Sequence, residues 1–238
     1  MRIIAVIPAR LTPTSQLLSE DTGKPLIAHT VAASKKHFET IVTTDSPEIY
    51  NAVRENCTNA PVVITGTCPT GTDRVRRAVH FMEQFSVLQH YDIVINWQAN
   101  FPELDGGYVA AAIKEFDKEE IDIVTIAAPA TPDELTSAHV TKVVTDHQGM
   151  AMYFSRSPIP HNGAEQALKH IGVYAFRQNI LASLGTLDDS SYPSEQLEQI
   201  QWLEAGLRIM VCVCPVEHAG ISTPEQYRKF VERHALQI

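Results

Sequence analysis

Basic and hydroxyl-bearing side chains follow short apolar runs at several points in the chain, where they could bind an anion. The first is Pro8-Ala9-Arg10, directly after an apolar run that ends at Ile7. A polar loop follows, and Gly23-Lys24-Pro25 then begins a helix, since proline suits the first helical turn. A helix N-terminus after a strand offers backbone N–H groups and a favourable dipole to an anion. The same pattern is also typical of an ordinary strand–helix turn.

A second group of polar residues lies in the C-terminal half. Arg156 stands beside turn prolines at the end of a predicted strand, where its guanidinium could bind a carboxylate bidentately. The run from Lys169 to Tyr174 alternates, so that His170 and Tyr174 share one strand face. Taken singly, each feature is as consistent with a structural role as with a functional one.

Well-known catalytic signatures do not explain these residues. The segment from Gly66 to Gly71 has the glycine spacing of a phosphate loop, but Thr72 stands where the lysine belongs. The chain has no dinucleotide fingerprint, nucleophile elbow or zincin motif. Its histidines do not pair at metal-ligand spacing, and its four cysteines match neither a zinc site nor a Cys-x-x-Cys pair. We therefore expect free thiols.

Strand and helix patterns alternate through the first half. The expected strands are Thr40–Thr44, Pro61–Ile64, Asp92–Asn96 and Asp122–Ala127, and the expected helices are Ser46–Asn56, Thr72–Phe85 and Gly107–Phe116. Ser46 and Pro47 give the first of these helices a cap and a first-turn proline. This alternation predicts an α/β fold with a doubly wound, mostly parallel sheet.

The second half has a different pattern. Strands Val140–Asp146 and Met150–Ser155 are expected to meet in a hairpin at His147-Gln148-Gly149. Further expected elements are strand Lys169–Phe176, helix Ser194–Ala205, strand Leu207–Cys214 and helix Pro224–Ala235 with Thr223 as its cap. We predict one domain over residues 1–238, with about residues 130–180 forming a small antiparallel lobe.

The overall composition indicates which classes of partner the protein is not expected to bind. The chain has 238 residues, 44% hydrophobic content and a formal net charge of −9. An acidic balance argues against general nucleic-acid or membrane-surface binding, both of which favour a basic face. No apolar run reaches membrane-spanning length, and the first run is too short for a signal peptide. We expect a cytoplasmic protein with neither a nucleic-acid nor a membrane partner.

Together these stretches resemble the cytidylyltransferases that activate 3-deoxy-manno-octulosonate (Kdo), the CMP-Kdo synthetases. The resemblance runs nearly end to end and rests on Ile7-Pro8-Ala9-Arg10, Gly23-Lys24-Pro25-Leu26-Ile27, Gly71-Thr72-Asp73-Arg74, Ile93–Gln98, Tyr153–Pro160, His170–Tyr174, Leu197-Glu198-Gln199 and Thr223-Pro224-Glu225. It implies a Rossmann-like core of the nucleotide-diphospho-sugar transferase type, whose antiparallel lobe mediates dimerisation. It also implies a Mg²⁺-dependent homodimer that couples CTP to a sugar acid in lipopolysaccharide biosynthesis.

The resemblance also assigns roles to individual residues. The implied nucleotide-binding residues are Ala9, Arg10, Thr72, Arg74 and Gln98. The implied sugar-acid-binding residues are Arg156, His170, Tyr174, Glu198 and Gln199, with Arg156 as the carboxylate partner. Arg10, Asn100 and Ser222 occupy catalytic positions of the family, and the last two stand where the family has its metal-binding aspartates.

The departures from the family pattern concern the residues that would hold the metal and compensate the charge of the triphosphate. Asn100 and Ser222 offer neutral oxygens, which are poor ligands for a hard cation. The loop from Leu11 to Thr22 has no basic residue and carries Glu20 and Asp21. The leading hypothesis is a divergent cytidylyltransferase with an impaired metal and triphosphate site. One alternative is a catalytically silent homologue that binds a sugar acid or a nucleotide, CTP or another, as a regulator or dimer partner. The other is transfer from a different donor that needs no triphosphate clamp.

Overall fold

The computed structural model describes residues 1–84, 90–161, 163–187, 197–216 and 220–235. The chain forms two compact units, one made of Met1–Gly107 with His218–Ile238 and the other of Tyr108–Glu217. We call them the first and the second unit and describe each by itself. No helix among the described residues is long and apolar enough to cross a membrane.

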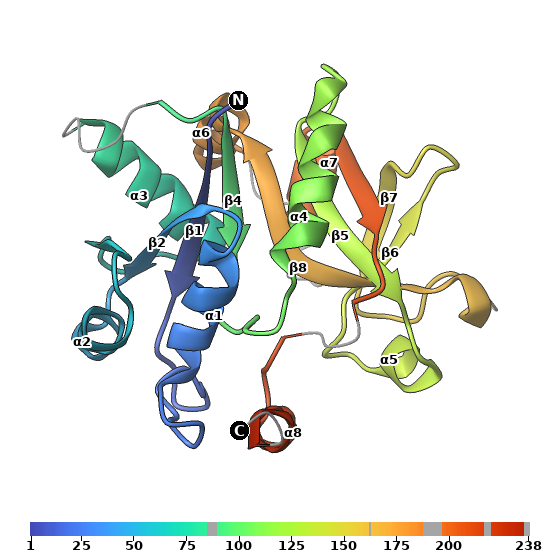
Figure 1. The fold of residues 1–238 in the computed structure, drawn as a ribbon. Helices are drawn as coiled ribbons and strands as arrows, with labels where there is room; N and C mark the ends of the chain where they lie inside the picture. The colour runs from blue at the N-terminus through green and yellow to red at the C-terminus, as the bar shows by residue number, and fades with distance from the viewer. Residues whose placement is uncertain (85–89, 162, 188–196, 217–219, 236–238) are drawn as a thin grey trace. The chain divides into compact units, whose positions relative to one another are not determined.

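The first unit contains a parallel sheet (Figure 1). Its strands, in spatial order, are β3 (Val62–Ile64), β2 (Glu39–Thr44), β1 (Ile3–Ala9) and β4 (Ile93–Trp97), and its connecting helices are α1 (Leu26–Lys35), α2 (Pro47–Asn56) and α3 (Gly71–Gln84). β1, β2 and β3 end together, because Thr44 lies opposite both Ala9 and Ile64. We call this end of the sheet the carboxyl edge. Ligands of open α/β sheets bind outside this edge.

The core of the first unit follows from its sequence. Ile4, Val6 and Ile7 of β1 are all 0% exposed, as expected for a parallel strand buried on both faces. The predicted cap of α2 is confirmed, since the Ser46 side chain accepts a hydrogen bond from the Ile49 N–H at 3.2 Å. Pro25 is the residue directly before α1.

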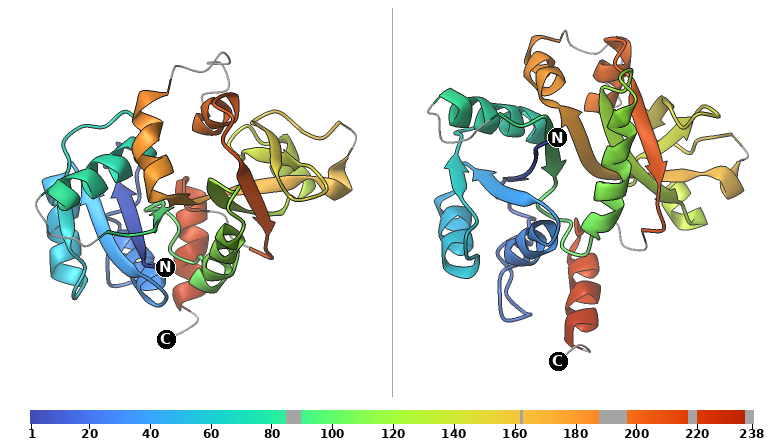
Figure 2. Two further views of the ribbon diagram at one scale, coloured as in Figure 1. Left: turned by 90° about the horizontal axis from the view of Figure 1, so that it is seen from above. Right: turned by 45° about the horizontal axis from the view of Figure 1, so that its top comes forward.

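The C-terminal helix α8 (Pro224–Ala235), red in Figure 2, also belongs to the first unit. Thr223 caps it as predicted, because its hydroxyl accepts from the Gln226 N–H at 3.2 Å. The Gln226 side chain in turn accepts from the Thr223 N–H at 3.0 Å. The helix packs onto α1 through aromatic rings, with the His29 centroid 5.1 Å from that of Phe230.

The second unit is built around β5 (Ile123–Pro129). This strand pairs antiparallel with β8 (Leu168–Arg177) and parallel with β9 (Ile209–Val213). The predicted hairpin is confirmed as β6 (Lys142–Thr145) and β7 (Ala151–Ser155), and β6 also pairs with β8. The predicted fold class, α/β with a mostly parallel sheet and an antiparallel part, is thereby confirmed. That the antiparallel part mediates dimerisation stays a prediction.

The remaining elements are short. They are α4 (Gly106–Ala112), α5 (Pro132–Thr136), α6 (Gln178–Ser183), α7 (Glu198–Glu204) and the 3₁₀ turns Ile113–Asp117, Ala164–Gln166 and Leu184–Thr186. α5 was not expected from the sequence, although Thr131 and Glu134 form a capping box at its start. The expected helix Ser194–Ala205 is present from Glu198, and residues 194–196 lie outside the described ranges.

Candidate functional site

The loop after β1 is held in a defined conformation by its own backbone. Ala9 is buried at the end of β1, and Arg10, the next residue, is exposed. Backbone hydrogen bonds close turns from Thr12 to Ser15 and from Glu20 to Gly23, and Gly23 has a φ of +84° that favours glycine. The buried Leu17 anchors this loop against the core.

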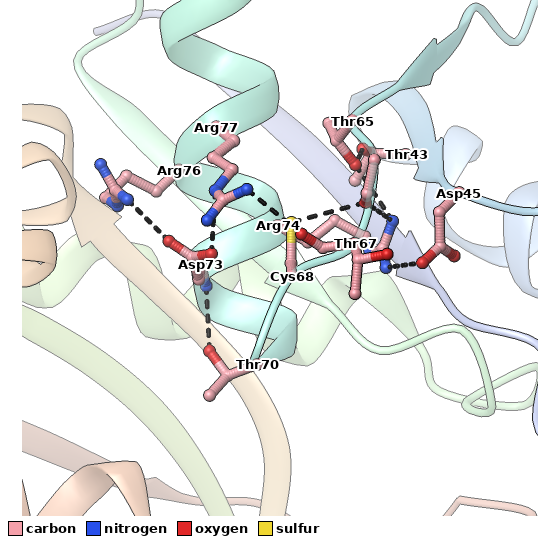
Figure 3. A network of polar contacts seen from close by, with 11 residues as sticks. Thr43, Asp45, Thr65, Thr67, Cys68, Thr70, Asp73, Arg74, Arg76 and Arg77 are labelled. Atoms are coloured by element: carbon pink, nitrogen blue, oxygen red, sulfur yellow. Dashed lines mark hydrogen bonds and ion pairs between the residues drawn. The ribbon is translucent and has the colours of Figure 1, made fainter.

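Arg74 lies near the carboxyl edge, where it is already paired (Figure 3). Its side chain is only 2% exposed, and Nη2 lies 2.8 Å from Oδ2 of Asp45. Nη1 donates to the Thr65 hydroxyl at 3.0 Å and to the Gly66 carbonyl at 3.1 Å. Arg74 therefore connects the residue after β2 to the loop after β3. Its charge is compensated within the protein, so it shapes the edge more than it supplies a free cation.

The start of α3 is fixed by neighbouring polar contacts. The Thr70 hydroxyl caps the helix by accepting from the Asp73 N–H at 3.0 Å, and the Asp73 carboxylate forms ion pairs with Arg76 and Arg77 (Figure 3). Thr72 is 3% exposed, and its hydroxyl accepts from Nδ2 of Asn96 in β4 at 3.2 Å. The phosphate-loop-like spacing at this position therefore belongs to a helix start packed on the sheet.

The loop after β4 is fixed by backbone contacts. The backbone carbonyl of Gln98, which is half-buried, accepts from the Phe101 N–H at 3.2 Å. The Ala99 carbonyl accepts from the Thr30 hydroxyl in α1 at 2.7 Å. These bonds hold Asn100 in place between Gln98 and the buried ring of Phe101.

Asn100 and Ser222, the two positions predicted from the resemblance to replace metal-binding aspartates, lie in contact. Nδ2 of Asn100 donates to Oγ of Ser222 at 3.1 Å. The backbone supports the contact, because the Ile221 N–H donates to the Asn100 carbonyl at 2.7 Å. A Cβ at Gly220 would lie 2.7 Å from the Phe101 ring, so glycine permits this close approach.

The contact between Asn100 and Ser222 does not fit Mg²⁺. The two side chains are an amide and a hydroxyl, both uncharged and already joined by a hydrogen bond. Hard cations prefer carboxylate oxygens, and no group of three His, Cys, Asp or Glu side chains in the described part of the chain could hold a metal. Glu20 and Asp21 are exposed on the loop after β1, and the Asp21 N–H donates to the Tyr227 hydroxyl at 3.2 Å.

In the second unit, β8 carries two of the predicted sugar-binding residues in one polar cluster. Nε2 of His170 lies 2.9 Å from the Thr125 hydroxyl of β5. The His170 ring lies between those of Phe154 and Tyr174, with centroid distances of 5.3 and 5.1 Å. Burial lowers the pKa of His170 to about 3, so the imidazole is neutral near pH 7.

The start of α7 completes this cluster. Nε2 of Gln199 donates to the Tyr174 hydroxyl, and Oε1 of Gln199 is buried without a hydrogen-bond partner in the described structure. Burial, and then the charge of the half-buried Glu198, raise the pKa of Tyr174 well above its usual value, so the phenol stays protonated. Trp202 packs edge-on against Tyr174 at 5.1 Å. A buried acceptor without a partner suits a ligand that brings a hydroxyl group.

Arg156 lies directly after β7 and is exposed. Its Nη1 donates to the Ala138 carbonyl at 3.1 Å. Lys142, which is 0% exposed, donates to the carbonyls of Ser137 at 2.9 Å, Val140 at 2.7 Å and Arg156. This lysine therefore ties the backbone of Arg156 to the segment from Ser137 to Val140, which contains the Ala138 carbonyl. It was not expected from the sequence.

Each unit therefore gathers one half of the predicted site. The first unit collects the predicted nucleotide and metal positions around its carboxyl edge, and the second unit collects His170, Tyr174 and Gln199 in one cluster. Sequence reasoning also missed Thr125, although Gly172 inside a strand pattern is a signal for the irregular pairing found there. The individual ligand-binding roles remain predictions.

Comparison with known proteins identifies the family. A family model described as cytidylyltransferase matches residues 4–211. The 3-deoxy-manno-octulosonate cytidylyltransferase of Anaeromyxobacter sp. (strain Fw109-5) is 34% identical over 235 residues, which cover 94% of this chain and 93% of the relative. The chain belongs to the 3-deoxy-manno-octulosonate cytidylyltransferase family. The enzyme of that name from Porphyromonas gingivalis (strain ATCC BAA-308 / W83) is also 34% identical, over 250 residues that cover 96% and 95% of the two chains.

Solved structures agree with this membership. A structure of CMP:2-keto-3-deoxy-manno-octonic acid synthetase complexed with CTP has a TM-score of 0.88, is 28% identical and covers 100% of both chains. The 4-diphosphocytidyl-2C-methyl-D-erythritol synthase of Anaerococcus prevotii DSM 20548 has a TM-score of 0.62 and is 15% identical. The match covers 100% of this chain and 96% of that one, and it shows that the two share a fold.

Proposed function

We propose that this protein is a divergent cytidylyltransferase that transfers CMP from CTP to a Kdo-like sugar acid, slowly compared with its relatives. The observation that carries the proposal is the cluster of His170, Tyr174 and Gln199. Its side chains are uncharged and packed against aromatic rings, and Oε1 of Gln199 has no hydrogen-bond partner among the described residues, which suits a polyhydroxylated ligand. Family membership supplies the reaction class.

The reaction needs positioning and charge compensation. The anomeric oxygen of the sugar acid forms a bond to the α-phosphorus while the bond from that phosphorus to the β-phosphate's bridging oxygen breaks. Pyrophosphate leaves, and the anomeric hydroxyl loses its proton. The chain's own residues would bind and orient the reactants, with exposed Arg10 for phosphate and exposed Arg156 for the sugar carboxylate.

The low rate of CMP transfer follows from the weak charge compensation at the carboxyl edge. In this family Mg²⁺ offsets the triphosphate charge, and the hydrogen-bonded Asn100 and Ser222 do not fit that ion. Arg74 is already neutralised by Asp45, and the loop from residue 11 to 22 carries acids but no base. Less charge compensation raises the barrier to phosphoryl transfer.

A second candidate function rests on the same contact between Asn100 and Ser222. Because a side-chain hydrogen bond joins the two former ligand positions, the protein could be a silent homologue that binds a sugar acid or nucleotide as a regulator or dimer partner. Both functions fit a cytoplasmic homodimer in lipopolysaccharide biosynthesis. Light scattering should give the mass of a dimer at micromolar concentration, and a monomer would refute that part of the proposal.

One experiment separates the two functions. Calorimetric titration with CTP and with Kdo, each with and without Mg²⁺, is combined with a pyrophosphate-release assay. Slow release supports the divergent enzyme, and binding without release supports the silent homologue. No binding of either ligand would refute both functions.

Arg156→Ala tests the carboxylate contact within this experiment. It should weaken Kdo binding by about 1.5–3 kcal/mol, as for a hydrogen bond to a charged group. Arg208→Ala, another exposed arginine of the second unit, is the control and should bind Kdo like the wild type. Equal affinity for Kdo in the two variants would contradict the role of Arg156.

A further inference from the structure

The hydrogen bonds around Thr125 determine which nitrogen of His170 carries the proton. We propose that Thr125 is a positioning residue that holds His170 as the Nε2–H tautomer, so that Nδ1 accepts a hydrogen bond from a hydroxyl group of the sugar acid. The tautomer part stands on the structure alone. The ligand part rests on the proposed function.

Thr125 lies where the pairing of β5 and β8 is irregular. Thr125 is opposite Tyr174, whereas the next residue, Ile126, is opposite Ile171. Gly172 and Val173 are therefore extra residues on β8. This shift brings the Val173 carbonyl to 2.7 Å and the Ile171 carbonyl to 3.5 Å from the buried Thr125 hydroxyl.

The single hydroxyl proton of Thr125 then determines the tautomer of His170. A threonine hydroxyl donates one hydrogen bond, and a backbone carbonyl can only accept. The Thr125 proton therefore points at the Val173 carbonyl, the nearer of the two. The hydroxyl can only accept from its third neighbour, Nε2 of His170 at 2.9 Å. Nε2 must carry a hydrogen.

The other ring nitrogen is consequently an acceptor. Burial keeps the imidazole neutral near pH 7, since it lowers the pKa of His170 to about 3, and a neutral ring with Nε2–H has a lone pair on Nδ1. Within the described residues Nδ1 makes no hydrogen bond. Phe154 packs edge-on against the ring at 5.3 Å and limits its rotation.

This arrangement gives His170 a definite selectivity. A lone pair in a partly buried site accepts from a hydroxyl and repels a carboxylate. The histidine therefore recognises a hydroxyl of the sugar acid, and the carboxylate is left to a cation such as Arg156. Sugar acids that lack this hydroxyl lose one hydrogen bond and are discriminated against.

The tautomer is tested without any ligand. Nitrogen-15 NMR of the histidine rings in the full chain at pH 7 should show His170 protonated at Nε2 and bare at Nδ1. A ring protonated at Nδ1 would overturn the proposal. Thr125→Val removes the hydroxyl at nearly equal volume, so His170 should no longer be protonated at Nε2 alone. Thr125→Ser keeps the hydroxyl and should keep the proton on Nε2. Thr145→Val in β6 is a matched strand control that should leave it unchanged.

Calorimetric titration with Kdo tests the ligand part. Thr125→Val should bind Kdo about five- to tenfold more weakly than the wild type, and Thr125→Ser should restore most of that loss. Equal affinity in all three folded proteins would overturn the ligand part. If Thr125→Val does not fold, the wild-type and Thr125→Ser spectra still decide the tautomer. Absence of Kdo binding in the wild type would refute the proposed function and the ligand part, and the spectra would still judge the tautomer.

Discussion

Asp45 and Arg74 form an ion pair at the carboxyl edge of the first unit, with 2.8 Å between Oδ2 and Nη2 (Figure 3). The guanidinium is almost fully buried, whereas Asp45 is 23% exposed. The same guanidinium holds Thr65 and Gly66 in the loop after β3. The pair therefore fixes the geometry of this edge without help from a ligand.

Arg74→Gln should lower the free energy of unfolding by about 2–4 kcal/mol, because it leaves Asp45 and two loop acceptors without their donor. Urea denaturation measures the change. Arg76→Gln is the control: it also breaks an ion pair of α3, but its side chain is 30% exposed, and the loss should stay below about 1 kcal/mol. Equal losses in the two variants would contradict the structural role of Arg74.

The contact between α1 and α8 should make stability depend on pH. Burial, then the charges of Lys24 and His234, lower the pKa of His29 to about 4. Its pKa in the unfolded chain is near 6.5, so on acidification the unfolded state takes up the proton first. The full contribution is present above pH 6.5 and is lost as the pH falls towards 4. The half-buried His170, whose pKa is lowered to about 3 by desolvation, adds a change of the same sign.

Urea midpoints at pH 7 and pH 5 test this dependence. The midpoint should fall at pH 5, and His29→Gln should reduce the fall. His147→Gln, in an exposed turn outside this contact, should behave like the wild type. A wild-type midpoint that is the same at both pH values would refute the prediction.

Local signals predicted the first unit well. The apolar run of β1, the cap at Ser46 and the cap at Thr223 are all properties of neighbouring residues, and all are confirmed. Local signals did not predict which residues the site residues contact. Arg74 and Asp45 are 29 positions apart in the sequence, and Asn100 and Ser222 are 122 apart. Resemblance predicts where such residues belong, but only the fold shows that they contact each other.

Lys142 shows why part of the second unit was missed. Lysine is rarely fully buried, so its position beside the apolar Val143 and Val144 gave no sign that its ammonium is enclosed. The carbonyls that accept from it belong to loops whose conformation no local pattern specifies. The irregular pairing at Thr125 had a clearer signal, since Gly172 interrupts a predicted strand.

Lys142→Met should therefore destabilise the protein by about 1–3 kcal/mol, since it keeps the volume but removes the donor to three carbonyls. Thermal or urea denaturation measures the loss. Lys118→Met is the control, because Lys118 is 54% exposed and forms a surface ion pair with Glu115. A Lys142→Met protein as stable as the control would show that water replaces the ammonium without cost.

The last prediction concerns the contact between Asn100 and Ser222. The double change Asn100→Asp with Ser222→Asp places two carboxylates where the side chains now lie 3.1 Å apart. Without a cation these charges repel, so the variant should be less stable than the wild type in EDTA. Mg²⁺ should bind between the carboxylates and raise the melting temperature, because a ligand that binds only the folded state stabilises it.

Three comparisons make this test specific. The wild type should show no Mg²⁺-dependent shift in melting temperature, and each single variant should shift less than the double variant. Pyrophosphate release from CTP and Kdo should rise in the double variant, at tenfold for every 1.4 kcal/mol of barrier removed. The gain should remain partial, because the loop from residue 11 to 22 still lacks a base. Wild-type turnover at an ordinary enzymatic rate, about 1–1000 per second, would show that other groups compensate the triphosphate charge.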